Sequence, residues 1–166
     1  MIRIPVLLLP LVLCTACGTT EASAPEGVSA DAHAVLTEPE TFEILSLHPS
    51  PHEEAGAPTP ADDFHGYKTL GRAAVDEPSE RRRIVELLYR GIRESDGSVA
   101  ACFNPRHGIH AEAGGRSVDF VICYECLSMF VYEDGAERES LTTAKTVEAE
   151  LGDLWADHDL SIYRGF

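Results

Sequence analysis

The sequence predicts an α+β domain, in which an antiparallel β-sheet of about four to five strands packs with two helices. Short runs with partly alternating apolar residues are separated by turn residues, and two longer segments carry apolar residues at helical spacing. Alternation is typical of strands with one buried face, and a spacing of three and four residues is typical of helices. Helices segregated on an antiparallel sheet define the α+β class.

The first two strands are expected on either side of a proline-rich loop. Residues 41–47 alternate partly and end at His48-Pro49. Residues 49–63 contain four prolines, several acids and a glycine, which indicates an exposed loop. Tyr67 to Val75 follows as the second strand, and Gly71 inside it is a candidate bulge.

Two helices are predicted from the positions of their apolar residues. Asp76-Glu77-Pro78-Ser79 has the acids and the early proline of a helix start, and Asp96-Gly97 is typical of a helix end. Between them, apolar residues recur on one helical face, at Ile84, Leu87, Leu88 and Ile92. The same spacing recurs near the end of the chain, at Val147, Leu151, Leu154 and Trp155.

A compact β region is expected between the two helices. Gly114-Gly115 suits a two-residue hairpin turn, which requires positive φ angles. The predicted strands are residues 98–103, 108–113, 117–123 and 127–132. If the two glycines form the turn, paired residues sum to 229, so that Cys123 faces Arg106. Cys126 lies just past this pair, and Cys102 lies at the end of the neighbouring predicted strand. Asn104-Pro105-Arg106-His107 and all three cysteines of the domain, Cys102, Cys123 and Cys126, are therefore expected to gather at the end of the sheet away from the turn.

The first seventeen residues predict export and lipid attachment. Arg3 precedes an apolar stretch from Ile4 to Leu13, which is shorter than the roughly 20 residues that span a membrane. A charged start, a short apolar centre and small residues make a secretory signal. Thr15-Ala16-Cys17 resembles a lipobox, although Cys14 stands where leucine is usual. We therefore expect cleavage before Cys17 and lipidation of Cys17; the alternative is a released secreted or periplasmic protein.

The same segment sets the expected domain organisation. Residues 1–17 are the lipoprotein signal, residues 18–40 a flexible tether and residues 41–166 a single α+β domain. The tether is predicted because residues 18–40 contain few large apolar side chains. Gly18 is not the aspartate that resembles an inner-membrane retention signal, so the outer membrane is favoured in a host with two membranes.

The charge of the chain limits its partners. The whole chain carries 13 basic and 28 acidic side chains, and removal of the signal takes away only Arg3, which leaves 12 against 28, or −16 with histidine neutral. Such a surface repels phosphate backbones and anionic lipid head groups. We therefore do not expect the protein to bind nucleic acids, and we expect the lipid alone to contact the membrane.

The cysteines give the candidate site. One interpretation is a structural zinc site with Cys102, His107, Cys123 and Cys126 as ligands and His110 in reserve, because thiolates and imidazole suit tetrahedral zinc. The other is a disulfide, which suits an exported protein but leaves one thiol over. A redox catalyst is disfavoured because the Cys-x-x-Cys motif lies between strands and does not open a helix. Buried cysteines without chemistry are the fourth interpretation.

Four segments carry a resemblance to a known family. They are Phe42 to Leu47, Phe64 to Lys68, Ala101 to Gly108 and Ile122 to Cys126. Together they resemble a family of uncharacterised exported bacterial proteins over about residues 41–133, and Cys-Phe-x-Pro-Arg-His-Gly is the most specific part. Some members carry asparagine at the position of His107, so the resemblance supports the three cysteines better than His107. It implies no reaction.

These observations predict a lipid-anchored cell-envelope protein with a cysteine-centred structural site and a binding role. Enzyme activity is not expected: Cys102 and His107 lie five residues apart in one loop with no orienting acid, and no phosphate-binding loop or metalloprotease motif is present. The alternative is a thiol-dependent enzyme or redox protein that uses the same three cysteines. Zinc is the one cofactor predicted, and no protein or small-molecule partner is identified.

Overall fold

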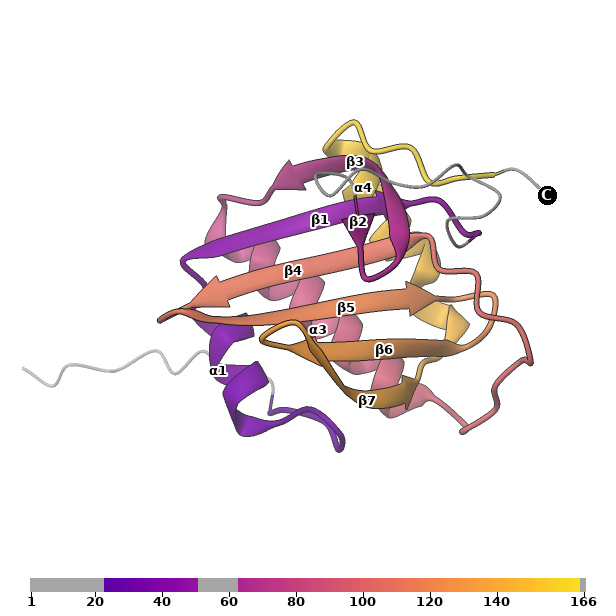
Figure 1. Ribbon diagram of the computed structural model, residues 1–166, viewed down its shortest axis with the longest axis horizontal. Helices are drawn as coiled ribbons and strands as arrows, with labels where there is room; N and C mark the ends of the chain where they lie inside the picture. Colours follow the sequence, from indigo (N-terminus) through magenta and orange to yellow (C-terminus); the bar gives the residue numbers. More distant parts are fainter. Residues whose placement is uncertain (1–22, 51–62, 165–166) are drawn as a thin grey trace, which may run out of the picture.

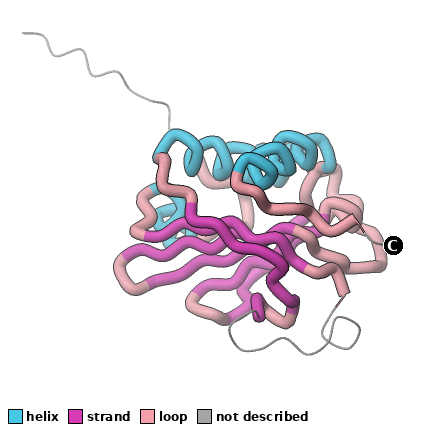
Figure 2. The backbone as a smooth tube through the Cα atoms, turned by 90° about the horizontal axis from the view of Figure 1, so that it is seen from above, coloured by secondary structure: helices cyan, strands magenta, loops and turns pink. Residues whose placement is uncertain are grey.

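The structure, a computed structural model, describes residues 23–50 and 63–164. Figure 1 shows a single curved sheet, and Figure 2 shows helices gathered on one side of it. The sheet has seven antiparallel strands in the order β2-β3-β1-β4-β5-β6-β7. Their bounds are β1 Thr41–Leu47, β2 Asp63–Phe64, β3 Tyr67–Ala74, β4 His107–Ala113, β5 Arg116–Cys123, β6 Ser128–Glu133 and β7 Ala136–Thr142. The helices are α1 Ala30–Thr37, α3 Pro78–Glu94 and α4 Glu148–Asp157, with a short 3-10 turn, η1 Lys145–Val147, before α4.

The predicted α+β class is confirmed, but the described residues hold more elements than expected. There are seven strands where four to five were predicted, and three α-helices where two were predicted. The additional edge strand β7 has the sequence Ala-Glu-Arg-Glu-Ser-Leu-Thr, and its first five residues are exposed. A strand that is polar on both faces lacks the alternation from which strands are predicted.

The predicted strand at residues 98–103 is wrong. The segment runs as an irregular connection after α3, and Ala100 donates a backbone hydrogen bond to the carbonyl of Cys126. The physical reason is the order of the sheet: β4 is paired with β1 on one side and β5 on the other, so no edge of β4 remains for another strand.

The predicted tether at residues 18–40 is also wrong for the part that forms α1. Ser29 caps this helix, its hydroxyl oxygen accepting from the amide of Ala32 at 2.9 Å. The helix buries Ala32, Val35 and Leu36 against the sheet. These few apolar residues share one helical face. The tether was predicted from the average composition of residues 18–40, and an average does not show how the apolar residues are spaced. Residues 18–22 lie outside the described part of the chain.

The hairpin register is confirmed. In the β4–β5 pair His107 lies opposite Ile122 and Ala113 opposite Arg116, so paired residues sum to 229. Gly114 and Gly115 have φ angles of 60° and 75°, the values that this turn requires. The predicted bulge near Gly71 is present as well, because the β1–β3 register shifts between Ser46 and Leu47, opposite Gly71 and Thr69.

The two faces of the sheet differ. The face under the helices carries the main core, which includes Phe120, Ile44 and Trp155. The indole nitrogen of Trp155 donates to the carbonyl oxygen of Leu45 at 2.8 Å and ties α4 to β1. The opposite face holds a smaller apolar cluster of Leu45, Leu47, Phe64 and Val121, covered by the β2–β3 turn. The two faces therefore provide different surroundings for the polar groups that are buried on them.

Candidate functional site

The three cysteines of the domain meet at one corner of the sheet, as predicted, although Cys102 lies on the irregular segment after α3 and not on a strand. Cys123, the last residue of β5, and Cys126 form a disulfide with 5.2 Å between their Cα atoms. Cys102 is a free, exposed cysteine whose sulfur lies 3.5 Å from the sulfur of Cys126. Cys123 and Cys126 are 1% and 0% exposed. The corner thus combines one accessible thiol with one buried disulfide.

Backbone amides point at both sulfur atoms of the disulfide. The amide of Asn104 donates to the sulfur of Cys126 at 3.3 Å. The amide of Cys126 donates to the sulfur of Cys123 at 3.1 Å. Hydrogen bonds to a sulfur atom favour its charged, thiolate form. The donors come from the chain on both sides of the corner, and they hold the two sulfur atoms of the disulfide in place.

The structure does not bring the four predicted zinc ligands together. His107 pairs with Ile122, and strand alternation puts Cys123 on the other face from Ile122. The ring of His107 lies instead against Tyr124 and Trp155, at centroid distances of 5.2 and 5.4 Å. Within the described ranges, no group of three or more His, Cys, Asp or Glu residues could hold a metal ion. His110, the reserve ligand, lies in a separate polar cluster on the open face of the sheet.

His107 is a buried imidazole that is 3% exposed. Among the described residues, neither ring nitrogen has a hydrogen-bond partner. Burial, assisted by the charge of Arg106, lowers the pKa of His107 to about 4, so that the ring is neutral at physiological pH. A neutral imidazole has one N–H donor and one acceptor. Leaving such groups unpaired costs about 1–3 kcal/mol each, so this position calls for a functional explanation.

A groove lies beside His107, along α4 and the segment after it. Its volume is about 1130 Å³, slightly above the ~300–1,000 Å³ typical of small-molecule pockets, and it is open to solvent on one side. Residues before β4 form one wall and the segment after α4 forms another. The lining residues that matter below are Arg106, His107, Glu125, Lys145, Glu148, Gly152, Asp153, Asp159 and Arg164.

The disulfide loop forms part of the groove wall. Tyr124 and Glu125 are the two residues enclosed by Cys123 and Cys126. Tyr124 packs its ring against His107, and Glu125 accepts a 2.7 Å hydrogen bond from Arg106. The Arg106 guanidinium holds the pKa of Glu125 below its usual value. Glu125 is thus the residue of the disulfide loop that lines the groove, and none of the three cysteines is among the lining residues.

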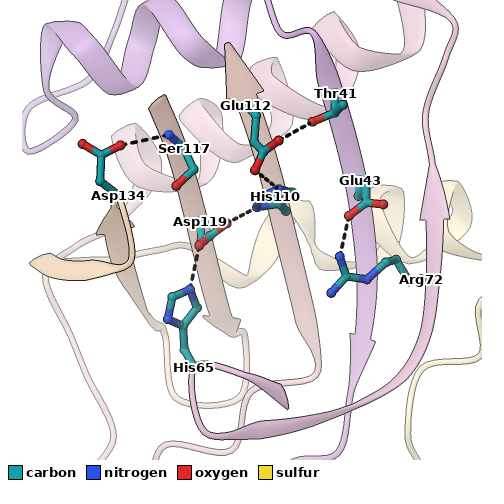
Figure 3. Close-up of polar contacts among 9 residues, drawn as sticks. All are labelled: Thr41, Glu43, His65, Arg72, His110, Glu112, Ser117, Asp119 and Asp134. Atoms are coloured by element: carbon teal, nitrogen blue, oxygen red, sulfur yellow. Dashed lines mark hydrogen bonds and ion pairs between the residues drawn. The ribbon is translucent and has the colours of Figure 1, made fainter. Parts of the chain in front are cut away.

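A second polar cluster on the open face was missed by the sequence analysis. Asp119 accepts from both His65, at 2.7 Å, and His110, at 2.5 Å (Figure 3). The other nitrogen of His110 lies 3.4 Å from Glu112. The hydrogen bond to Asp119 raises the pKa of His110 against the opposing effect of burial. The two histidines likewise hold the pKa of Asp119 low, although burial opposes this.

The β2–β3 turn brings His65 to this cluster. His65 and Gly66 have φ angles of 52° and 89°, as in a tight hairpin turn. The ring of His65 stacks on Tyr132 at 3.6 Å between centroids. The predicted register already places His110 opposite Asp119, because 110 and 119 also sum to 229, so this pair could have been predicted. The contact from His65 crosses 54 residues and leaves no local signal.

The predicted signal and the lipidation residue Cys17 lie outside the described residues. In the part that is described, no helix is both long enough and apolar enough to span a bilayer.

The chain was compared with models of protein families, with curated proteins and with solved structures, and none of the three comparisons found a match.

Proposed function

We propose that this chain is a lipid-anchored envelope protein, attached through Cys17, whose domain binds a small ligand without catalysing a reaction. The anchor is supported by the order of charged, apolar and small residues before Cys17. The binding role is supported by the groove along α4. Outer-membrane placement, in a host with two membranes, is proposed on the residue after Cys17.

One observation carries the binding role. His107 belongs to the groove wall, is buried, and has both ring nitrogens unpaired among the described residues. Ordinary core packing favours an apolar residue at such a position, because an unpaired polar group is costly. A ligand whose polar group displaced the side chains that cover His107 and paired with a ring nitrogen would offset that cost.

The charges of the groove favour a small zwitterionic ligand, such as an amino acid or a short peptide. Arg106, Lys145 and Arg164 provide positive charge, and Glu125, Glu148, Asp153 and Asp159 provide negative charge. Arg106 already pairs with Glu125 at 2.7 Å, and Lys145 lies 3.8 Å from Glu148. For Asp153, Asp159 and Arg164, by contrast, the described residues provide no ion pair within 4.0 Å, which leaves charges of both signs for a ligand.

Gly152 offers a direct test, because it lies on α4 in the groove wall. A Cβ atom added there meets nothing within 4 Å, so we expect Gly152→Leu to fill part of the groove without disturbing the fold. Ala34→Leu, on the exposed side of α1, is the matched control. The probes are the amino acids and a set of dipeptides, and binding is followed by NMR shifts of backbone amides.

We expect at least one probe to shift resonances of β4, α4 and residues 159–164 in the wild type and in Ala34→Leu. The same probe should cause no shifts in Gly152→Leu. Shifts confined to another surface, or no shifts from any probe, would overturn the proposed ligand class and its site.

A further inference from the structure

The cysteine corner places a free thiol next to a disulfide, the two groups that thiol–disulfide exchange requires. The exposed thiol of Cys102 lies 3.5 Å from the sulfur of Cys126, which is already bonded to Cys123. Exchange begins when a thiolate attacks one sulfur atom of a disulfide. In the described part of the chain, Cys102 is the free cysteine, and it is the accessible one of the three.

We infer that Cys102 is the entry point through which an external thiol reduces the buried Cys123–Cys126 disulfide. This activity goes beyond ligand binding and does not depend on it. Direct attack by an external thiol is hindered, because Cys123 and Cys126 are 1% and 0% exposed. The exposed thiol of Cys102 removes this hindrance by carrying the exchange from the surface to the buried pair.

The internal step balances without an oxidant. The thiolate of Cys102 attacks the sulfur of Cys126, a Cys102–Cys126 disulfide forms, and the Cys123–Cys126 bond breaks. The bonding electrons leave with the sulfur of Cys123, which then takes up a proton. One disulfide and one thiol are present before and after the step, and only their positions change.

The amide donors favour this direction of attack. The leaving sulfur, Cys123, already accepts the amide of Cys126 at 3.1 Å, and this hydrogen bond stabilises the thiolate as it forms. A leaving group with a stabilised thiolate departs faster. The central sulfur, Cys126, accepts the amide of Asn104 at 3.3 Å, which holds it beside Cys102.

An external thiol completes the reduction. Its thiolate attacks the sulfur of Cys102, a mixed disulfide forms on Cys102, and Cys126 leaves as a thiolate. A second external thiolate then attacks the external sulfur of that mixed disulfide and releases Cys102. In sum, two external thiols are oxidised to their disulfide, and the buried disulfide is reduced to two thiols.

Exchange also bears on the groove, a consequence that rests on the proposed function. The new disulfide joins residues 24 positions apart, whereas the old one joins residues 3 positions apart. The short loop that holds Tyr124 against His107 and Glu125 against Arg106 is then no longer closed. Reduction at the corner would thereby loosen one wall of the groove.

The first test uses the full lipidated chain in detergent with reduced glutathione as the probe. Free thiols are alkylated at intervals, and labelling of Cys123 and Cys126 is measured by mass spectrometry. We expect the buried disulfide to be reduced about tenfold faster, or more, in the wild type than in Cys102→Ser. Because Cys102 is exposed, Cys102→Ser should keep the fold. Equal rates in the two chains would overturn the inference.

A second variant tests the new pairing itself. Cys123→Ser leaves Cys102 and Cys126 as two thiols, and oxidised glutathione should convert them into an internal disulfide with release of two reduced glutathiones. A chain that gains only glutathione adducts, or that is isolated with bound zinc and no disulfide, would overturn the inference. Neither readout uses a groove ligand, so a failed ligand panel and a failed exchange assay are distinguishable.

Discussion

His107 and His110 lie on the same strand, β4, yet their surroundings change their chemistry in opposite directions. His107 faces the helices, has no hydrogen-bond partner among the described residues, and has its pKa lowered to about 4. His110 faces the open side and donates a 2.5 Å hydrogen bond to Asp119, which raises the pKa of His110. His107 is buried without a partner, whereas His110 is only partly buried and has a carboxylate partner, so burial and the carboxylate together make the difference.

His110 stabilises the fold through its bond to Asp119, whereas His107 is a polar group that the fold only tolerates. Asp119 satisfies both His65 and His110, and so holds the β2–β3 turn on the sheet. His107 receives no such compensation and lies beside a groove. An uncompensated buried polar group is the kind of local conflict expected at a functional site.

The largest expected effect is on acid stability, and it comes from His107. The folded pKa is about 4 and the unfolded value about 6.5, so the unfolded chain binds the proton first as pH falls. The stabilising contribution is present above pH ~6.5 and is lost between pH ~6.5 and ~4, a change of about 3 kcal/mol. His107→Leu should therefore lose about 3 kcal/mol less than the wild type between pH 7 and pH 4, as measured by urea unfolding.

The control for this experiment is Ile109→Leu, which alters the next inward-facing residue of β4 without removing a titratable group. It should keep the acid sensitivity of the wild type. If His107→Leu also keeps it, His107 is not buried in its neutral form.

The next effect is on the stability that Asp119 contributes through its two histidine partners. Asp119→Asn removes the charge that accepts hydrogen bonds from His65 and His110, and should lower the free energy of unfolding at pH 6 by about 2 kcal/mol, the size typical of a hydrogen bond to a charged group. The raised pKa of His110 means that its contribution is present below pH ~6.5 and is lost as pH rises through the folded value. The loss caused by Asp119→Asn should thus shrink in alkaline solution.

Glu112→Gln is the matched control, because Glu112 also faces His110, at 3.4 Å, but is exposed. Exposed ion pairs contribute about 0–1 kcal/mol. A cost for Asp119→Asn no larger than the cost for Glu112→Gln would mean that the buried carboxylate does not stabilise the cluster.

The smallest effect comes from Tyr124, which packs against His107. Its hydroxyl is buried without a hydrogen-bond partner in the described residues, and burial raises its pKa. Tyr124→Phe should be neutral or stabilise the protein by about 0.5–1 kcal/mol. Thermal unfolding measures this, with Tyr132→Phe as the control that loses a long, exposed hydrogen bond to Glu137. A loss above about 1 kcal/mol for Tyr124→Phe would show that the hydroxyl is hydrogen-bonded after all.

The sequence predicted what local rules determine. Two adjacent glycines set the turn, the turn set the register, and the register placed Cys123 and Cys126 at the far end of the sheet, whereas Cys102 arrives there from an irregular segment and not from the predicted strand. The same rule, applied one step further, would have separated His107 from the cysteines, because residues 122 and 123 face opposite sides of a strand.

The parts of the structure that the sequence did not predict depend on contacts between segments far apart in the chain. The helix α1 is short and its apolar residues are few, so its stability comes from packing on β4 and β5. The strand β7 is polar and is held by pairing with β6. The contact of His65 with Asp119 depends on how the β2–β3 turn folds over the sheet.

The most direct test of the account measures zinc and free thiols together in the full-length chain purified without reducing agent. If His107 lines a ligand-binding groove and the cysteines carry out thiol–disulfide exchange, the chain contains no zinc and one free thiol, at Cys102. One zinc per chain, with three thiols that react only after chelation, would contradict it and return His107 to the ligands of a metal.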